Sequence, residues 1–249
     1  MSSAKVRNAY LTTRILDTPL WAIYNMLPII LYKDLHASPL QIALLVSLKP
    51  LMSLVSFFFS HWMTGRMLTS TIVLARVLGL LLFLLFPYIS SIPLILSTYG
   101  LYMAMTVGTV PSWIELLKQN LGAAEQKKTF ALGSSYGYLG GGILPFLFAY
   151  FLDYYPGSWK WLFQGSAILA LLATFLVFRL KSEKNPEIKT PNIVIKPWKE
   201  SFLLLKDCPD FGFFQTGFMV FGMGLMILQP SLPIYFVDEL HMSYSELAL

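Results

Sequence analysis

The sequence predicts an all-α membrane protein whose helices cross the bilayer several times. Apolar residue types make up 56% of the 249 residues and charged types only 12%, about half the charged share of an ordinary soluble domain. Apolar stretches of about 20 residues, enough to cross roughly 30 Å of hydrocarbon as a helix, recur along the chain. A soluble enzyme and a disordered chain are excluded because no single core could hide so much apolar surface. The single cysteine, Cys208, excludes a disulfide-stabilised domain.

Seven stretches are predicted to span the membrane. In chain order they run near Tyr10–Tyr32, Leu40–Trp62, Thr69–Tyr88, Ile92–Ile114, Thr129–Leu152, Trp159–Leu180 and Phe211–Val237. Helices are expected because backbone groups in lipid must bond internally, and runs such as Leu78–Phe86 lack the alternation of a barrel strand. The first stretch follows basic residues, as a signal peptide does. Asp17 and Pro19 interrupt it, however, so a retained helix is predicted.

The distribution of lysine and arginine predicts the orientation. With the N-terminus in the cytoplasm, 14 of these residues fall in cytoplasmic segments and 2 fall on the opposite side. This bias predicts a multi-pass protein of the cell (inner) membrane with a cytoplasmic N-terminus. Because topology explains the formal net charge of +5, nucleic acid is not expected as a partner.

Three regions follow from the spans. Residues 1–180 are expected to form a six-helix transmembrane bundle, residues 181–210 a cytoplasmic loop, and residues 211–249 a seventh transmembrane helix with the start of an eighth. Within the loop, apolar residues recur at helical spacing between lysines, which predicts an interfacial helix over Pro197–Asp207 on the cytoplasmic leaflet. The alternative is a short extension of the seventh span.

The chain contains an internal repeat. Leu27–Leu44 and Leu232–Leu249 match at an offset of 205 residues, with eight of 18 positions identical. The identical pairs other than leucine and isoleucine are Pro28/Pro233, His36/His241, Ser38/Ser243 and Ala43/Ala248. Both segments are expected to end an outward-running helix and begin the next span, so a six-helix unit repeats in parallel, as in the two halves of some transporters. Chance similarity between two apolar segments is the alternative.

On these residues the chain resembles the major facilitator superfamily (MFS) of transporters over essentially its whole length. Gly157–Phe163 (GSWKWLF) is similar to the family's entry to its sixth helix, and Pro197–Phe211 is similar to its middle loop. The family's motif between the second and third helices is kept in part. Gly65 and Arg66 are present as gating residues, but Trp62 stands where an Asp is expected, so a salt bridge that depends on that Asp is not implied.

The resemblance implies an MFS-like six-helix N-terminal bundle plus a seventh transmembrane helix. It implies a secondary active transporter or facilitator that moves a small solute by alternating access within the lipid bilayer, without enzyme activity and without a cofactor. The family fold needs twelve helices, so a truncated or fragmentary form is expected, with a separately encoded C-terminal half as one source of the rest. The alternatives are a complete seven-helix sensor or interaction protein, and an inactive remnant of a split gene.

Polar side chains inside the spans predict the lining of a solute cavity, and the resemblance implies that the first, second, fourth, fifth and seventh helices contribute to it. The predicted lining residues are Tyr24 and Asn25 in the first span, Lys49 in the second, Tyr99, Tyr102, Thr106 and Thr109 in the fourth, and Gln215 and Gln229 in the seventh. The alternative for each stripe is helix–helix packing, since small and hydroxylated residues also mediate close contacts in membranes.

Three charged residues fall inside spans. Lys49 lies near the middle of its span, too deep to reach the interface, so it is expected to face a cavity or a partner and to bind or orient a solute. Asp17 in the sequence DTP is typical of a helix N-cap; if the helix begins earlier, Asp17 becomes a coupling residue. Arg76 is expected to extend towards the cytoplasm, although a pair with Asp17 at similar depth is open.

The fifth span carries glycines at four-residue spacing, namely Gly133, Gly137 and Gly141, followed by Pro145. Such glycines let helix backbones approach closely, so a packing seam is predicted, and a hinge against a second half is the alternative. The three histidines are dispersed, so no metal site is expected. No phosphate-binding loop or catalytic motif is present.

Overall fold

The computed structural model describes residues 3–62, 66–180 and 195–248, with side chains for all of these except 55–62 and 195–197. The helices are α1 (Ser3–Leu35), α2 (Pro39–Trp62), α3 (Leu68–Leu81), η1 (Leu82–Tyr88), α4 (Ile92–Asn120), α5 (Ala123–Tyr154), α6 (Trp159–Phe178), α7 (Ile195–Asp207), α8 (Pro209–Leu228), α9 (Ser231–Ile234), η2 (Tyr235–Glu239) and α10 (Tyr244–Ala248). Six helical segments of the described chain are long and apolar enough to cross a membrane, and the described apolar part of α2 is shorter. The predicted all-α membrane fold is therefore confirmed.

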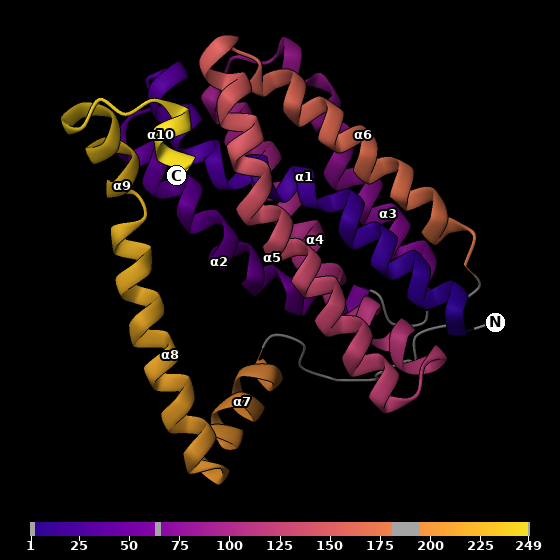
Figure 1. The fold of residues 1–249 in the computed structure, drawn as a ribbon. Helices are drawn as coiled ribbons and strands as arrows, with labels where there is room; N and C mark the ends of the chain where they lie inside the picture. The colour runs from indigo at the N-terminus through magenta and orange to yellow at the C-terminus, as the bar shows by residue number, and fades with distance from the viewer. Residues whose placement is uncertain (1–2, 63–65, 181–194, 249) are drawn as a thin grey trace.

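Helices α1 to α6 pack as one bundle, while α8 runs along its outside (Figure 1). Helix α1 packs mainly against α5 and α6, and α4 packs against both α2 and α3. No residue of α8 is buried. The segment that follows it packs on the bundle, with α9 against α1 and α10 against α5 (Figure 1). We call the end of the bundle at which α1 ends and α2 begins the distal end.

Several boundaries differ from the predicted spans. Helix α1 begins at Ser3, seven residues before the predicted start, and runs through both Pro19 and Pro28. The third span changes from an α-helix to a 3-10 helix at Leu82, where Pro87 follows. The seventh span is interrupted near Pro230, because a proline cannot continue the hydrogen-bond ladder of a helix, and it ends in a π-helical turn.

The sequence repeat is also a repeat of backbone structure. His36 and His241 adopt left-handed conformations with φ of 52° and 51°, which are uncommon for residues with a Cβ. One residue later, the amide of Ala37 donates to the Leu31 carbonyl, and the amide of Met242 donates to the Phe236 carbonyl, both at 3.0 Å. The same corner therefore closes both outward-running helices.

Each corner leads into the same capping arrangement of the next helix. The Ser38 amide donates to Gln41 Oε1 at 2.8 Å, and the Gln41 amide donates to Ser38 Oγ at 3.3 Å. At the second corner Ser243 and Glu246 exchange the equivalent bonds at 2.7 and 3.2 Å. These reciprocal bonds form a capping box, and the hydrogen bonds from Ser243 hold the pKa of Glu246 below its usual value. Chance similarity does not account for two corners that agree in this detail.

The loop between the sixth and seventh spans contains the predicted helix. Helix α7 ends at Asp207 and is separated by Cys208 from α8, and the two helices form a V in Figure 1. The α7 helix is therefore not an extension of the seventh span. Its exposed Trp198 and Phe202 suit an apolar face directed at lipid, but its place at the membrane surface stays a prediction.

Candidate functional site

Two adjoining cavities lie along α1, and residues of α1 and α2 line both of them. The first, about 560 Å³, lies between α1, α2 and α5, and we call it the α5 cavity. The second, about 330 Å³, lies between α1, α2, α4 and the segment from α8 to η2, and we call it the α8 cavity. Trp21, Asn25 and Lys49 line both cavities, so the two form one site. Small-molecule sites usually measure about 300–1,000 Å³.

One stripe of α1 supplies most of the site. Arg14, Asp17, Trp21, Asn25 and Pro28 follow one another at spacings of three or four residues, so they share a face of the helix. The first four line the α5 cavity, and the last three line the α8 cavity. The prediction that Asn25 lines a cavity agrees with this placement.

Lys49 enters the site from α2. Its ammonium lies 5.3 Å from the centre of the Trp21 ring, a cation–π distance. Lys49 makes no ion pair with any described residue, although a charge at the centre of a span costs about 2.5–3.5 kcal/mol on insertion scales. The cavity gives this charge access to water or to a ligand, as the sequence predicts.

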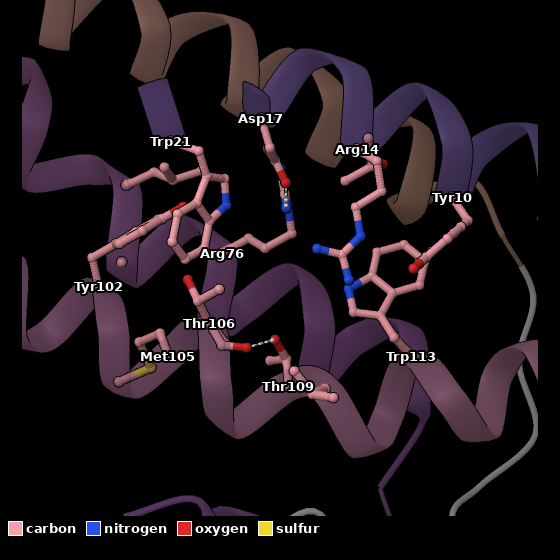
Figure 2. A pocket seen from close by; sticks show the side chains of 15 residues that line it. Tyr10, Arg14, Asp17, Trp21, Arg76, Tyr102, Met105, Thr106, Thr109 and Trp113 are labelled. Atoms are coloured by element: carbon pink, nitrogen blue, oxygen red, sulfur yellow. Dashed lines mark hydrogen bonds and ion pairs between the residues drawn. The ribbon is translucent and has the colours of Figure 1, made fainter. Parts of the chain in front are cut away.

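Asp17 and Arg76 form an ion pair between α1 and α3 (Figure 2). Arg76 Nη1 and Nη2 each donate to one carboxylate oxygen of Asp17 at 2.7 Å. The guanidinium also donates to Thr174 Oγ1 and to the Ala170 carbonyl on α6, both at 2.9 Å. An arginine guanidinium has five N–H donors in a planar fork, which suits this arrangement. Arg76 of α3 therefore joins its own helix to both α1 and α6.

This pair corrects two predictions. Asp17 is not an N-cap, because α1 begins at Ser3 and carries Asp17 in its interior. Arg76 does not extend towards an aqueous surface, since its side chain is only 12% exposed. The signal available in the sequence was the presence of opposite charges at similar depth in the first and third spans.

Tyr24 lies at the centre of an aromatic cluster behind the α8 cavity. Its ring stacks on Tyr102 at 5.0 Å between centroids and meets Tyr99, Phe83 and Phe163 edge-on at 5.1, 5.6 and 5.3 Å. Such pairs contribute about 0.5–1.5 kcal/mol each beyond burial. Tyr24 therefore serves helix packing and also lines the α8 cavity together with Tyr99. Its buried hydroxyl has no hydrogen-bond partner among the described residues.

The rest of the fourth-span stripe faces a smaller hollow. Tyr102, Thr106 and Thr109 line a space of about 40 Å³ beside the Asp17–Arg76 pair (Figure 2), enough for about one water molecule. Thr109 Oγ1 donates to the Thr106 carbonyl of its own helix at 3.0 Å. These three predicted lining residues thus border the ion pair and neither of the two large cavities.

The glycines of α5 divide between packing and the cavity. A Cβ on Gly133 would lie 2.7 Å from Tyr10 Cε1, and one on Gly140 would lie 1.9 Å from Thr18 Cγ2. Gly137 meets no described atom within 4 Å, and the nearest to Gly141 is Asn25 Nδ2 at 3.8 Å. The close approach to α1 therefore uses Gly133 and Gly140. Gly137 and Gly141 line the α5 cavity without such a contact, and Gly133 borders the cavity as well. The predicted packing seam is wrong at Gly137 and Gly141. Residues seven apart, such as Gly133 and Gly140, stay on one face of an α-helix, whereas steps of four residues turn gradually away from it.

Of the five remaining predicted residues, four lie in the described part of the chain. Gln229 lines the α8 cavity. Gln215 lies in the first half of α8 and lines neither large cavity, and Pro145 lies inside α5 beyond the cavity-lining glycines. Arg66 is exposed next to α3, and Gly65 lies outside the described residues. The gating roles of Gly65 and Arg66 therefore stay predictions.

The distal end holds a contact that the sequence reasoning missed. Asp153, at the end of α5, accepts the amides of Tyr244 and Ser245 at 2.9 and 2.8 Å, and the Ser245 hydroxyl at 2.5 Å. It thereby caps α10 from another helix. The Tyr244 hydroxyl donates to Asp34 Oδ1 at 2.8 Å. We call these two interactions the distal clamp.

Two more bonds connect the same elements. Lys33 Nζ donates to the Met242 carbonyl at 3.1 Å and lies 4.5 Å from the centre of the Tyr244 ring. The Tyr32 hydroxyl donates to Asp238 Oδ2. The segment after the seventh span is thus fixed to α1 and α5 at this end, while the first half of α8 leaves the bundle (Figure 1).

Comparison with known proteins identifies the fold. No curated protein matches the sequence. A solved structure described as a bacterial homologue of the human lysosomal transporter Spinster, inward-facing and unoccupied, matches 99% of this chain with a TM-score of 0.66 and 16% identity. The match covers 58% of that protein's chain. The family model of the Major Facilitator Superfamily matches residues 10–249. The chain belongs to the Major Facilitator Superfamily.

Proposed function

We propose that the chain forms the solute pathway of a secondary transporter, a protein of the inner membrane with its N-terminus in the cytoplasm. The observation that carries the proposal is the joined cavity on α1, which Lys49 borders. At the distal end, the clamp fastens α10 to α5 and α1. Proteins of this family are transporters rather than enzymes, and the cavity is an ordinary size for a small solute.

Alternating access supplies the mechanism. With the N-terminus in the cytoplasm, the distal end faces outward, and the distal clamp closes the site on that side. The related Spinster homologue was described in an inward-facing conformation, which agrees with closure at the outer side. Transport then requires the bonds of Asp153 and Asp34 to break as the opposite side closes, so that the site changes the side on which it is open.

The clamp makes this proposal testable without knowledge of the solute. Asp153 Oδ2 and Ser245 Oγ lie 2.5 Å apart, so D153C together with S245C, in a C208S background, brings two thiols near one another. Their disulfide, verified by mass, would hold the distal end closed. The native gene product that carries these substitutions is reconstituted into vesicles containing a cell extract. The solutes that leave are compared by mass spectrometry with the disulfide oxidised and reduced, and the single D153C variant is the control.

At least one small solute should leave only in the reduced state. Identical release in both states, with the disulfide confirmed by mass, would contradict the transport proposal. Asp17 stays a proposed coupling residue, and proton binding there would have to compete with its two bonds from Arg76. A separately encoded C-terminal half is a further prediction, which the mass and co-purifying partners of the native product test.

A further inference from the structure

Among its described lining residues, the joined cavity carries positive charge without a matching free carboxylate. Arg14 and Lys49 both line the α5 cavity. Arg14 contacts the ring of Tyr10 at 5.1 Å, Lys49 contacts that of Trp21, and neither forms an ion pair with a described residue. Both cations rest against aromatic rings with their charge uncompensated.

In the described lining of the α5 cavity, the one carboxylate is already neutralised. Both carboxylate oxygens of Asp17 accept hydrogen bonds from Arg76. The Arg76 guanidinium is buried and also donates to groups on α6. The described lining of the α5 cavity thus holds two uncompensated positive charges. A cationic solute would meet these charges with no free acidic partner, whereas an anion would satisfy them.

Neutral polar groups can bind the rest of such a solute. Asn25 and Ser134 line the α5 cavity and supply donors and acceptors. On the α8 side, Gln229 supplies a side-chain amide. Lys49 and Trp21 lie where the two cavities meet.

We propose that the joined cavity binds an anionic solute, with Lys49 and Arg14 as its charge-recognising residues. Lys49 faces the point at which both cavities can be reached, and Arg14 lies seven residues before Trp21 on α1, roughly 10 Å along the helix axis. The site therefore favours a small anion over a cation or a zwitterion. This inference rests on the proposed transport function, and its test uses purified protein without transport.

The electrostatic part can be measured with a cysteine in the cavity. S134C in a C208S background places a thiol beside Arg14 and Lys49, and its reaction rates with a sulfonate and with a trimethylammonium methanethiosulfonate reagent are compared. The anionic reagent should react faster. K49M or R14M should lower the anion-to-cation rate ratio at least about threefold, and K49R and R14K should keep it.

The native Cys208 is the matched control, since it is exposed and lies outside the cavity lining. With Ser134 unchanged, K49M and R14M should leave the rate ratio at Cys208 as it is, which separates a local field from misfolding. Equal rates with the two reagents at S134C, or a faster reaction with the cationic reagent, would overturn the proposal even if transport is found. An anion-to-cation rate ratio that K49M and R14M leave unchanged would overturn it as well.

Binding is tested with a matched pair of probes. Succinate and putrescine each have four carbons, but succinate carries two negative charges and putrescine two positive charges. Each is added while S134C reacts with neutral methyl methanethiosulfonate. Succinate should slow the reaction and lose this effect in K49M, while putrescine should not slow it. Stronger protection by putrescine, or none by succinate, would refute anion binding, whereas failure of the disulfide experiment would refute transport alone.

Discussion

Arg76 donates to both carboxylate oxygens of Asp17 at 2.7 Å and so ties α3 to α1. The same guanidinium reaches Ala170 and Thr174 on α6. Removing one member of a buried pair leaves an uncompensated charge and usually costs about 3–5 kcal/mol, whereas replacing both members can be nearly neutral.

The first prediction concerns this pair. R76M should lower the unfolding temperature strongly, and the double variant D17N/R76M should recover a large part of the loss because no isolated charge remains. Thermal unfolding of the purified protein in detergent measures both. A double variant no more stable than R76M would show that the pair contributes little coupling energy.

Lys49 should behave in the opposite way. Because Lys49 has no ion-pair partner among the described residues, K49A removes a costly charge and should leave the unfolding temperature unchanged or higher. Transport of the solute identified in the vesicle experiment should fall at least about tenfold, as expected when a charge-assisted hydrogen bond is lost. A marked loss of stability, with transport kept, would assign Lys49 a structural role.

The glycines of α5 provide a matched pair of substitutions. G140A places a methyl group 1.9 Å from Thr18 Cγ2 and should destabilise the protein by about 1–3 kcal/mol, as overpacking does. G137A, three residues earlier, meets open space and should be tolerated. Unfolding temperatures of the two variants are compared, and T18A should rescue G140A. Equal effects at both positions would contradict the observed packing register.

The distal clamp should set how often the site opens outward. D153A removes the acceptor of three hydrogen bonds from α10, each worth about 1.5–3 kcal/mol when the acceptor is charged. A cysteine at Ile29, which lines the α8 cavity, should then react at least about tenfold faster with a membrane-impermeant reagent added from outside. E239A is the control, because Glu239 is exposed at the end of η2 and makes no described bond to α1 or α5. An unchanged rate in D153A would mean that the clamp does not hold this end closed.

Patterns along the chain predicted more of the fold than of the site. The spans and the repeat could be predicted because hydropathy and a shared Pro, His and Ser are properties of local sequence. The Asp17–Arg76 pair depends on the packing of α1 beside α3, which residue spacing within one span cannot reveal. Helical spacing placed Thr106 and Thr109 correctly on one face of α4, but only the neighbouring helices decide that this face meets the ion pair.

The distal clamp escaped prediction for a related reason. Asp153 follows the fifth span immediately, where a carboxylate is ordinary for a helix end in water. Its partners, Tyr244 and Ser245, lie more than 90 residues away and bind through backbone amides, which carry no signature of residue type. Contacts of this kind become visible only in three dimensions.

In the proposed transport cycle, the uncompensated charges of Lys49 and Arg14 would make the protein sensitive to the membrane voltage. A unit charge that crosses the whole potential gains or loses roughly 2.3 kcal/mol per 100 mV, and a site that changes sides carries its charge through part of that drop. Asp17 and Arg76 contribute no net charge because they move together. An anion bound in the proposed site would cancel part of the charge of Lys49 and Arg14, so the empty and loaded states should respond differently to voltage, and the potential should act more strongly on the empty state.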